Sequence, residues 1–235
     1  MSDPAIALAF FDPERGLHGS ARSGVTLLFE RGKPQALPEG PEVSRAGEGW
    51  RAVVGNRFDL TFSPLSDSLE LDGASAQVCR VSGSVDGARL ECLGTATETA
   101  APPHWDDLDA LRGISALFDE QNAVLALARR PRGAVGHGKE RVLAWLVSPG
   151  GAQLVEDARI STVYDADGRQ RSAGLELWLP GEDFPRRASG TAVAGTTLSL
   201  EGLRVNAAVF SWRMEGRHGA GAYELTFRDE PPEAA

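Results

Sequence analysis

The chain has 235 residues, of which 42% are hydrophobic and 24% charged, an ordinary composition for a folded protein. Its formal net charge of −9 argues against nucleic acid or an anionic membrane as the main partner, because both require a basic surface. No apolar run is long enough to span a membrane, and the N-terminus lacks the basic start and apolar stretch of a signal peptide. These features predict a cytoplasmic protein without a transmembrane segment.

Short apolar runs separated by turn residues fill the first half of the chain. We expect strands at 6–11, 22–29, 50–55, 57–62, 68–71, 77–85 and 88–97. Phe58, Leu60 and Phe62 share one face of their strand by period-two alternation. Asp86-Gly87 is a strong hairpin signal, because both residue types tolerate positive φ. Residues 35–49 are rich in proline and glycine and are predicted to form a loop.

The second half repeats this pattern after a break at Ala100–His104. Residues 105–112 are predicted to form a single helical turn, with aspartates at its start. Strands are then expected at 114–118, 123–128, 139–147, 153–164, 170–179, 187–193, 196–203, 205–215 and 220–227. About fifteen short strands predict an all-β protein, an antiparallel sandwich or barrel pair. We expect two domains, residues 1–104 and 105–235.

Two sequence matches suggest that a β unit was duplicated. His18-Gly19-Ser20-Ala21-Arg22 matches His137-Gly138-Lys139-Glu140-Arg141, and residues 85–94 match residues 193–202 at their Val, Gly and Leu positions. The second match predicts a hairpin turn at Ala194-Gly195. Together the matches predict two halves of about a hundred residues each.

Cys79 and Cys92 flank the predicted turn at Asp86-Gly87. A two-residue turn there places Cys92 opposite Val81, so the two cysteines are offset. We therefore expect two reduced, buried cysteines.

Three of the four histidines stand in His-Gly pairs, at positions 18, 137 and 218. They can be ordinary turn residues. Alternatively, His137, Arg141 and Trp145 lie on one strand face and line a cavity, with His137 as a proton carrier and the other two as ligand contacts. No His-x-His or Glu-x-x-His spacing supports a metal site, and none is predicted. The sequence also predicts no cofactor.

Aromatic side chains concentrate in the C-terminal half. Trp178, Trp212 and Tyr223 are candidate walls of an apolar ligand pocket, although aromatic residues also dominate ordinary β cores. Glu176 and Glu224 are candidate acids beside such a pocket. Either glutamate can equally be a simple surface charge.

Several of these motifs resemble one family. The stretches are Phe10-Phe11-Asp12-Pro13, Gly136–Arg141, Phe210-Ser211-Trp212 and Gly216–Glu224. They look like the corresponding stretches of hydroxyneurosporene synthase (carotenoid hydratase) and its double-lipocalin relatives. The resemblance implies two lipocalin-like β-barrel halves and a site for an isoprenoid or another apolar small molecule.

Three functions are compatible with this reading. The first is an enzyme that hydrates or cyclises an apolar alkene, for which His137, Glu176 or Glu224 would supply the proton and aromatic faces would stabilise positive charge. The second is a carrier of an apolar small molecule that does not transform it. The third is a protein with filled barrels and only structural or interaction roles. The sequence leaves the oligomeric state open.

Overall fold

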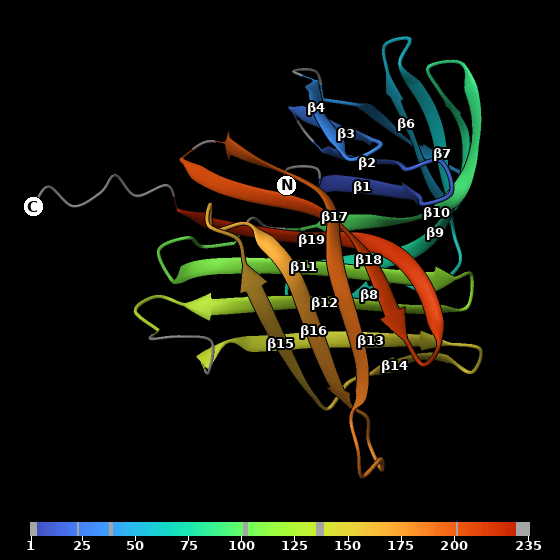
Figure 1. The fold of residues 1–235 in the computed structure, drawn as a ribbon. Helices are drawn as coiled ribbons and strands as arrows, with labels where there is room; N and C mark the ends of the chain where they lie inside the picture. The colour runs from blue at the N-terminus through green and yellow to red at the C-terminus, as the bar shows by residue number, and fades with distance from the viewer. Residues whose placement is uncertain are drawn as a thin grey trace, which may run out of the picture.

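A computed structural model describes residues 4–22, 24–37, 40–100, 103–134, 139–200 and 202–228 (Figure 1). These residues form 19 β-strands and no α-helix, which confirms the all-β prediction. Within them, no helix is long and apolar enough to cross a membrane. The strands form two curled antiparallel sheets, one from each half of the chain.

The first sheet contains the ten strands before residue 100. They are β1 (Ala5–Asp12), β2 (Leu17–Arg22), β3 (Val25–Glu30), β4 (Lys33–Leu37), β5 (Glu42–Ala46), β6 (Gly49–Val54), β7 (Phe58–Pro64), β8 (Leu69–Glu70), β9 (Ala74–Val85) and β10 (Ala88–Thr99). Their order is β4-β3-β2-β1-β10-β9-β7-β6-β5, and β8 pairs with β9.

The second sheet contains nine strands. They are β11 (Leu108–Asp119), β12 (Asn122–Pro131), β13 (Arg141–Ser148), β14 (Gly151–Leu154), β15 (Asp157–Tyr164), β16 (Gln170–Trp178), β17 (Arg186–Leu200), β18 (Leu203–Met214) and β19 (Arg217–Arg228). Their order is β14-β13-β12-β11-β19-β18-β17-β16-β15, the same succession as in the first sheet apart from β8. The expected domain boundary, between residues 104 and 105, falls in the connection between the sheets.

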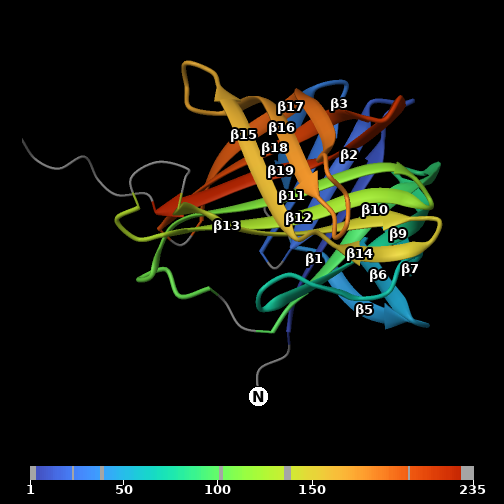
Figure 2. The same cartoon turned by 90° about the horizontal axis from the view of Figure 1, so that it is seen from below.

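The second sheet closes on itself as a barrel. Its strands β11 to β13 lie in one layer, and β15 to β18 cross that layer at a steep angle (Figure 2). The N–H of Val155 donates to the carbonyl of Ala144 at 2.9 Å, so the chain entering β15 is hydrogen-bonded to β13. We call this half the C-terminal barrel and the first half the N-terminal barrel.

Three apolar cores hold the molecule together. Two fill the barrels, and the third lies between them with contributions from both sheets. Alternation explains which residues enter each core. In β16, Leu175 and Leu177 point into the C-terminal barrel, whereas Glu176 and Trp178 point outward.

Two local predictions were wrong. The described part of 35–49 is not a loop throughout, because the end of β4 and the whole of β5 lie there as edge strands, and an edge strand tolerates Pro34. The expected helical turn at 105–112 is a turn at residues 105–106 followed by the start of β11. Leu108, Ala110 and Arg112 are buried on one face of β11, a period of two rather than 3.6.

The two halves share their strand order, but the sequence matches do not mark equivalent positions. His18 and Arg22 lie in β2, whereas Arg141 begins β13, whose counterpart by sheet position is β3. The expected turn at Ala194-Gly195 does not exist, because both residues lie within β17. The counterpart of the Asp86-Gly87 turn is the turn between β18 and β19, at Glu215-Gly216.

Those two turns have the same backbone conformation. The φ angles are 47° and 78° at Asp86 and Gly87, and 50° and 79° at Glu215 and Gly216. Two successive positive values are typical of the type I′ turn that fits the twist of a hairpin. The register places Cys92 opposite Val81, as predicted, and both cysteines are free.

Candidate functional site

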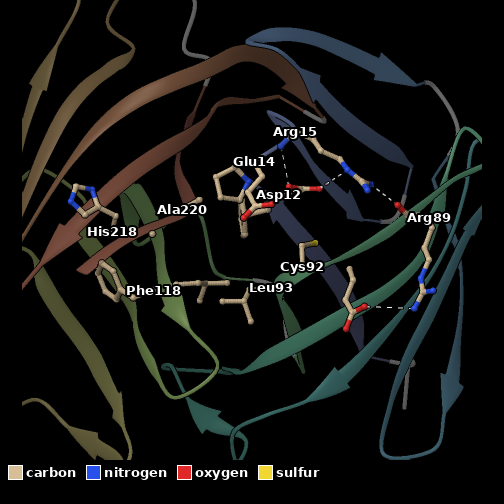
Figure 3. A pocket seen from close by; sticks show the side chains of 14 residues that line it. Asp12, Glu14, Arg15, Arg89, Cys92, Leu93, Phe118, His218 and Ala220 are labelled. Carbon is tan, nitrogen blue, oxygen red and sulfur yellow. Dashed lines mark hydrogen bonds and ion pairs between the residues drawn. The ribbon is translucent and has the colours of Figure 1, made fainter. Parts of the chain in front are cut away.

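A cleft of about 470 Å³ lies where the ends of the two barrels meet (Figure 3). Its floor is apolar and comes from both halves. The floor residues are Phe11, Cys92 and Leu93 from the first sheet and Leu117, Phe118 and Ala220 from the second. Its rim is polar and consists of Asp12, Glu14, Arg15, Arg89, Glu91 and His218. A molecule seated here would touch strands from both halves.

The backbone at the second-half side of the cleft requires glycine. A Cβ atom on Gly219 would lie 2.1 Å from the carbonyl oxygen of Leu117. Only a residue without a side chain therefore lets β19 approach β11 at this point, where Leu117 pairs with Ala220. This close approach places Leu117 and Ala220 side by side in the cleft floor.

The charges of the rim are largely satisfied by one another. The N–H of Arg15 donates to Asp12 Oδ1 at 3.1 Å, and the guanidinium of Arg15 donates to the carbonyl of Arg89. Arg89 Nη2 in turn lies 3.7 Å from Glu91 Oε2. Asp12 is buried, whereas Glu14 and Glu91 are exposed. The cleft therefore offers one enclosed carboxyl group above an apolar floor.

The cleft thiol is not poised for nucleophilic chemistry. Burial raises the pKa of Cys92 to about 12, so the thiol is protonated at neutral pH. Among the described residues, no group of histidine, cysteine or acidic side chains is arranged to hold a metal ion.

His18 lies behind the floor of the cleft. Its ring centroid is 6.2 Å from that of Phe11, and the residue is 4% exposed. Burial lowers the pKa of His18, and the nearby Asp12 offsets only part of that effect. Its Nδ1 atom has no hydrogen-bond partner within the described structure. His18 is therefore a neutral, buried histidine at neutral pH.

A second polar cluster lies inside the C-terminal barrel. Arg112 pairs with Glu140, whose other oxygen accepts from Arg130 Nε at 3.1 Å. Arg112 Nη1 also donates to Thr162 Oγ1 at 3.2 Å and to the Tyr223 hydroxyl at 3.1 Å. The Arg112 and Glu140 side chains are only 1% and 3% exposed. Burial raises the pKa of the Tyr223 hydroxyl, and Arg112 offsets part of the rise.

The sequence reading missed this cluster, although strand parity carries a signal for it. Glu140 has the same parity as Ala144 and Leu146, which point into the barrel, and Arg112 has the parity of Ala110 and Ile114. The Arg112–Glu140 pair itself joins β11 to the residue that precedes β13, and no local sequence pattern connects these two positions.

Of the predicted site residues, Trp212 and Tyr223 lie together in the C-terminal barrel. Phe210 stands between them, with ring centroids 5.2 Å from Trp212 and 5.5 Å from Tyr223. Trp212 and Tyr223 are each 0% exposed, so no water-sized space borders them. Their aromatic rings pack the barrel interior.

The other predicted residues are dispersed. Glu176 lies on the outer face and accepts from Arg187 Nε at 3.0 Å. Trp178 is also on the outer face, and its ring centroid lies 4.7 Å from the guanidinium carbon of Arg159. His137 lies outside the described residues.

Glu224, Trp145 and Arg141 lie toward the N-terminal barrel or the surface. Arg22 Nη1 donates to Glu224 Oε1 at 2.9 Å and joins the two sheets. Burial alone would raise the pKa of Glu224, but the pairing with Arg22 lowers it overall. Trp145 packs on the core between the barrels, and its Nε1 donates to the carbonyl of Glu70 at 2.9 Å. Arg141 is exposed.

No protein-family model and no curated protein sequence matches the chain. Solved structures that share its fold include two that align over most of the chain. A candidate AttH protein from Nitrosomonas europaea has a TM-score of 0.66 at 14% identity, over 94% of this chain and 91% of that one. Kievitone hydratase from Nectria haematococca has a TM-score of 0.56 at 10% identity, over 96% of this chain and 88% of that one. The chain therefore has the tandem lipocalin-like fold of these two proteins.

Proposed function

We propose that this protein binds an apolar small molecule in the cleft between its two barrels. The observation that carries the proposal is the cleft itself, with a volume of about 470 Å³ and a floor of aromatic and aliphatic side chains from both halves. Ligand sites are typically concave, mostly apolar and about 300–1,000 Å³ in volume, with a few polar groups that fix orientation. The polar rim around Asp12 and Arg15 fits that description.

The packed barrel interiors favour the cleft as the binding place. The C-terminal barrel is filled by Phe210, Trp212 and Tyr223, and the N-terminal barrel by buried side chains such as Phe58 and Phe62. A ligand inside either barrel would have to displace part of a well-packed core, which costs several kcal/mol. Entry into the open cleft displaces only water.

A neutral, environment-sensitive apolar dye such as Nile red tests this proposal. Leu93→Trp should reduce dye binding strongly, because the indole would occupy space above the cleft floor. Leu154→Trp is the matched control, since Leu154 is an exposed leucine that does not line the cleft. Equal dye binding by the two variants and the unmodified protein would remove the cleft from consideration.

Hydration of an alkene in the same cleft is a second candidate function. The observation that favours it is the enclosed Asp12 carboxyl above the aromatic floor of Phe11 and Phe118. Asp12 would act as general acid toward an alkene carbon, the aromatic faces would stabilise the cation, and water would add to it and return a proton to the Asp12 carboxylate. The shared fold with kievitone hydratase makes kievitone a rational first substrate to test.

The hydration test uses kievitone in isotope-labelled water and mass spectrometry of the product. The unmodified protein should incorporate the label, Asp12→Asn should not, and Glu14→Gln should behave like the unmodified protein because Glu14 is exposed on the rim. Label incorporation that survives Asp12→Asn would exclude Asp12 as the proton donor. No incorporation by any of them would leave binding as the function to pursue.

A further inference from the structure

The mouth of the C-terminal barrel holds two guanidinium groups around one carboxylate. Strand register gives their depth. Ala110 pairs with Arg130 on one side and with Phe227 on the other, so these residues form one layer near the end of the sheet, with the Leu108–Pro131 pair beyond it. Arg112 lies one inward-facing position deeper, and Ile114, paired with Tyr223, lies one deeper again. The charged groups therefore lie in two adjacent layers near the end of the barrel, outside the layer of Ile114 and Tyr223.

The shared carboxylate belongs to Glu140. Arg130 reaches it from the rim, with a side chain that is 24% exposed, and Arg112 reaches it from inside. A guanidinium presents five N–H donors in a planar fork, and the contact with Glu140 uses only the Nε donor of Arg130. The mouth thus combines a solvent-accessible cation with a second, buried cation behind it.

The wall beside this pair is apolar and partly accessible. Val142, Tyr164 and Phe227 are half-buried residues that pack on the barrel core. Strand register places Phe227 in the layer of Arg130 and, through Ala128, Val142 in the layer of Arg112. An apolar group lying on these side chains would have its polar end beside the guanidinium of Arg130. A ligand that places a charged group beside this apolar wall loses water around that group, which is costly unless the charge is paired. The wall therefore suits a ligand whose anionic end forms hydrogen bonds with the guanidinium of Arg130.

We infer that the mouth of the C-terminal barrel binds a monocarboxylate with an apolar body, and that Arg130 is its principal charged contact. The carboxylate accepts from the Arg130 fork, and the hydrocarbon lies against Phe227, Tyr164 and Val142. A monoanion fits better than a dianionic phosphate, because Glu140 already supplies one negative charge to the two arginines. This site is separate from the cleft between the barrels.

Dodecanoate is the probe, and dodecanol is its uncharged counterpart. Isothermal titration should show that the protein binds dodecanoate more tightly than dodecanol. Arg130→Met should weaken dodecanoate binding by about tenfold or more, the loss expected for one charge-assisted hydrogen bond, and should leave dodecanol binding unchanged. Arg187→Met, which removes an exposed arginine on the outer face, should leave both unchanged.

Three results would overturn the inference. One is equal binding of the acid and the alcohol by the unmodified protein, a comparison that needs no variant and so does not depend on folding. Another is unweakened dodecanoate binding by Arg130→Met. The third is loss of dodecanoate binding in Leu93→Trp, because that variant blocks only the cleft. If Leu93→Trp retains dodecanoate binding and Arg130→Met loses it, the two sites are distinct.

Discussion

Removal of the Glu140 carboxylate should destabilise the C-terminal barrel strongly. In Glu140→Ala, Arg112 keeps its hydrogen bonds to Thr162 and Tyr223 but loses its anionic partner while only 1% of its side chain is exposed. Breaking a buried ion pair by removing one partner costs about 3–5 kcal/mol, because the remaining charge has neither water nor a counter-ion. Arg130 is partly exposed and can turn to water, which places the expected loss near 3 kcal/mol.

Equilibrium unfolding in urea, followed by tryptophan fluorescence, measures this loss. Glu176→Ala is the control, since it removes a glutamate paired with Arg187 at the surface, where an ion pair contributes about 0–1 kcal/mol. The double variant Arg112→Met/Glu140→Leu should recover most of the stability, because apolar side chains of similar size replace both charges. Equal losses in Glu140→Ala and Glu176→Ala would refute the view that Arg112 is a buried charge dependent on Glu140.

Other predictions concern the backbone and the buried titratable groups. Gly221→Ala should lower the free energy of unfolding by about 1–3 kcal/mol, because the added Cβ would lie 1.9 Å from the carbonyl oxygen of Ser115. Gly113→Ala is the control in the same unfolding assay and should be nearly neutral, because its Cβ would meet nothing within 4 Å. Because the pKa of His18 is lowered in the folded protein, the unfolded chain binds the proton more readily, and the unfolding free energy should fall as pH drops through 6.5. His18→Gln should make the unfolding free energy depend less on pH in this range. An unchanged pH dependence would show that His18 is not the group responsible. The pKa of Glu224 is lowered by Arg22, so the stability from this pair should be present above the usual value of 4.5 and lost as pH falls below it. Arg22→Met should reverse the sign of this pH dependence, because burial without the cation raises the pKa of Glu224.

Local alternation accounts for much of what the sequence predicted. The pattern of Phe58, Leu60 and Phe62 gives β7, and the Asp86-Gly87 turn fixes the register that separates Cys92 from Cys79. In β16 the same alternation puts Glu176 and Trp178 on one face, which points outward and not into a pocket as expected. The opposite face carries three leucines, at 175, 177 and 179, and all three are buried. These leucines in the sequence indicate that their face, and not the face of Glu176, points inward.

The rest depends on how distant strands meet. Arg112 lies in β11 and Glu140 directly precedes β13, and their pairing follows from the curl of the C-terminal sheet rather than from any motif. The cleft is formed by strand ends from both halves, such as Phe11 and Ala220, which no spacing along the chain connects. The duplicated strand order was predicted from matches at non-equivalent positions, since short glycine motifs recur wherever strands need turns or close approaches.

Photochemical labelling tests the cleft as the ligand site most directly. A neutral alkyl diazirine, activated by light in the presence of the protein and followed by peptide mass spectrometry, should mark the segments that line the cleft, residues 11–15, 89–93, 117–118 and 218–220. Leu93→Trp should suppress this labelling, and Leu154→Trp should not. Labelling concentrated instead on residues 205–214, which include Phe210 and Trp212 inside the C-terminal barrel, would contradict the account.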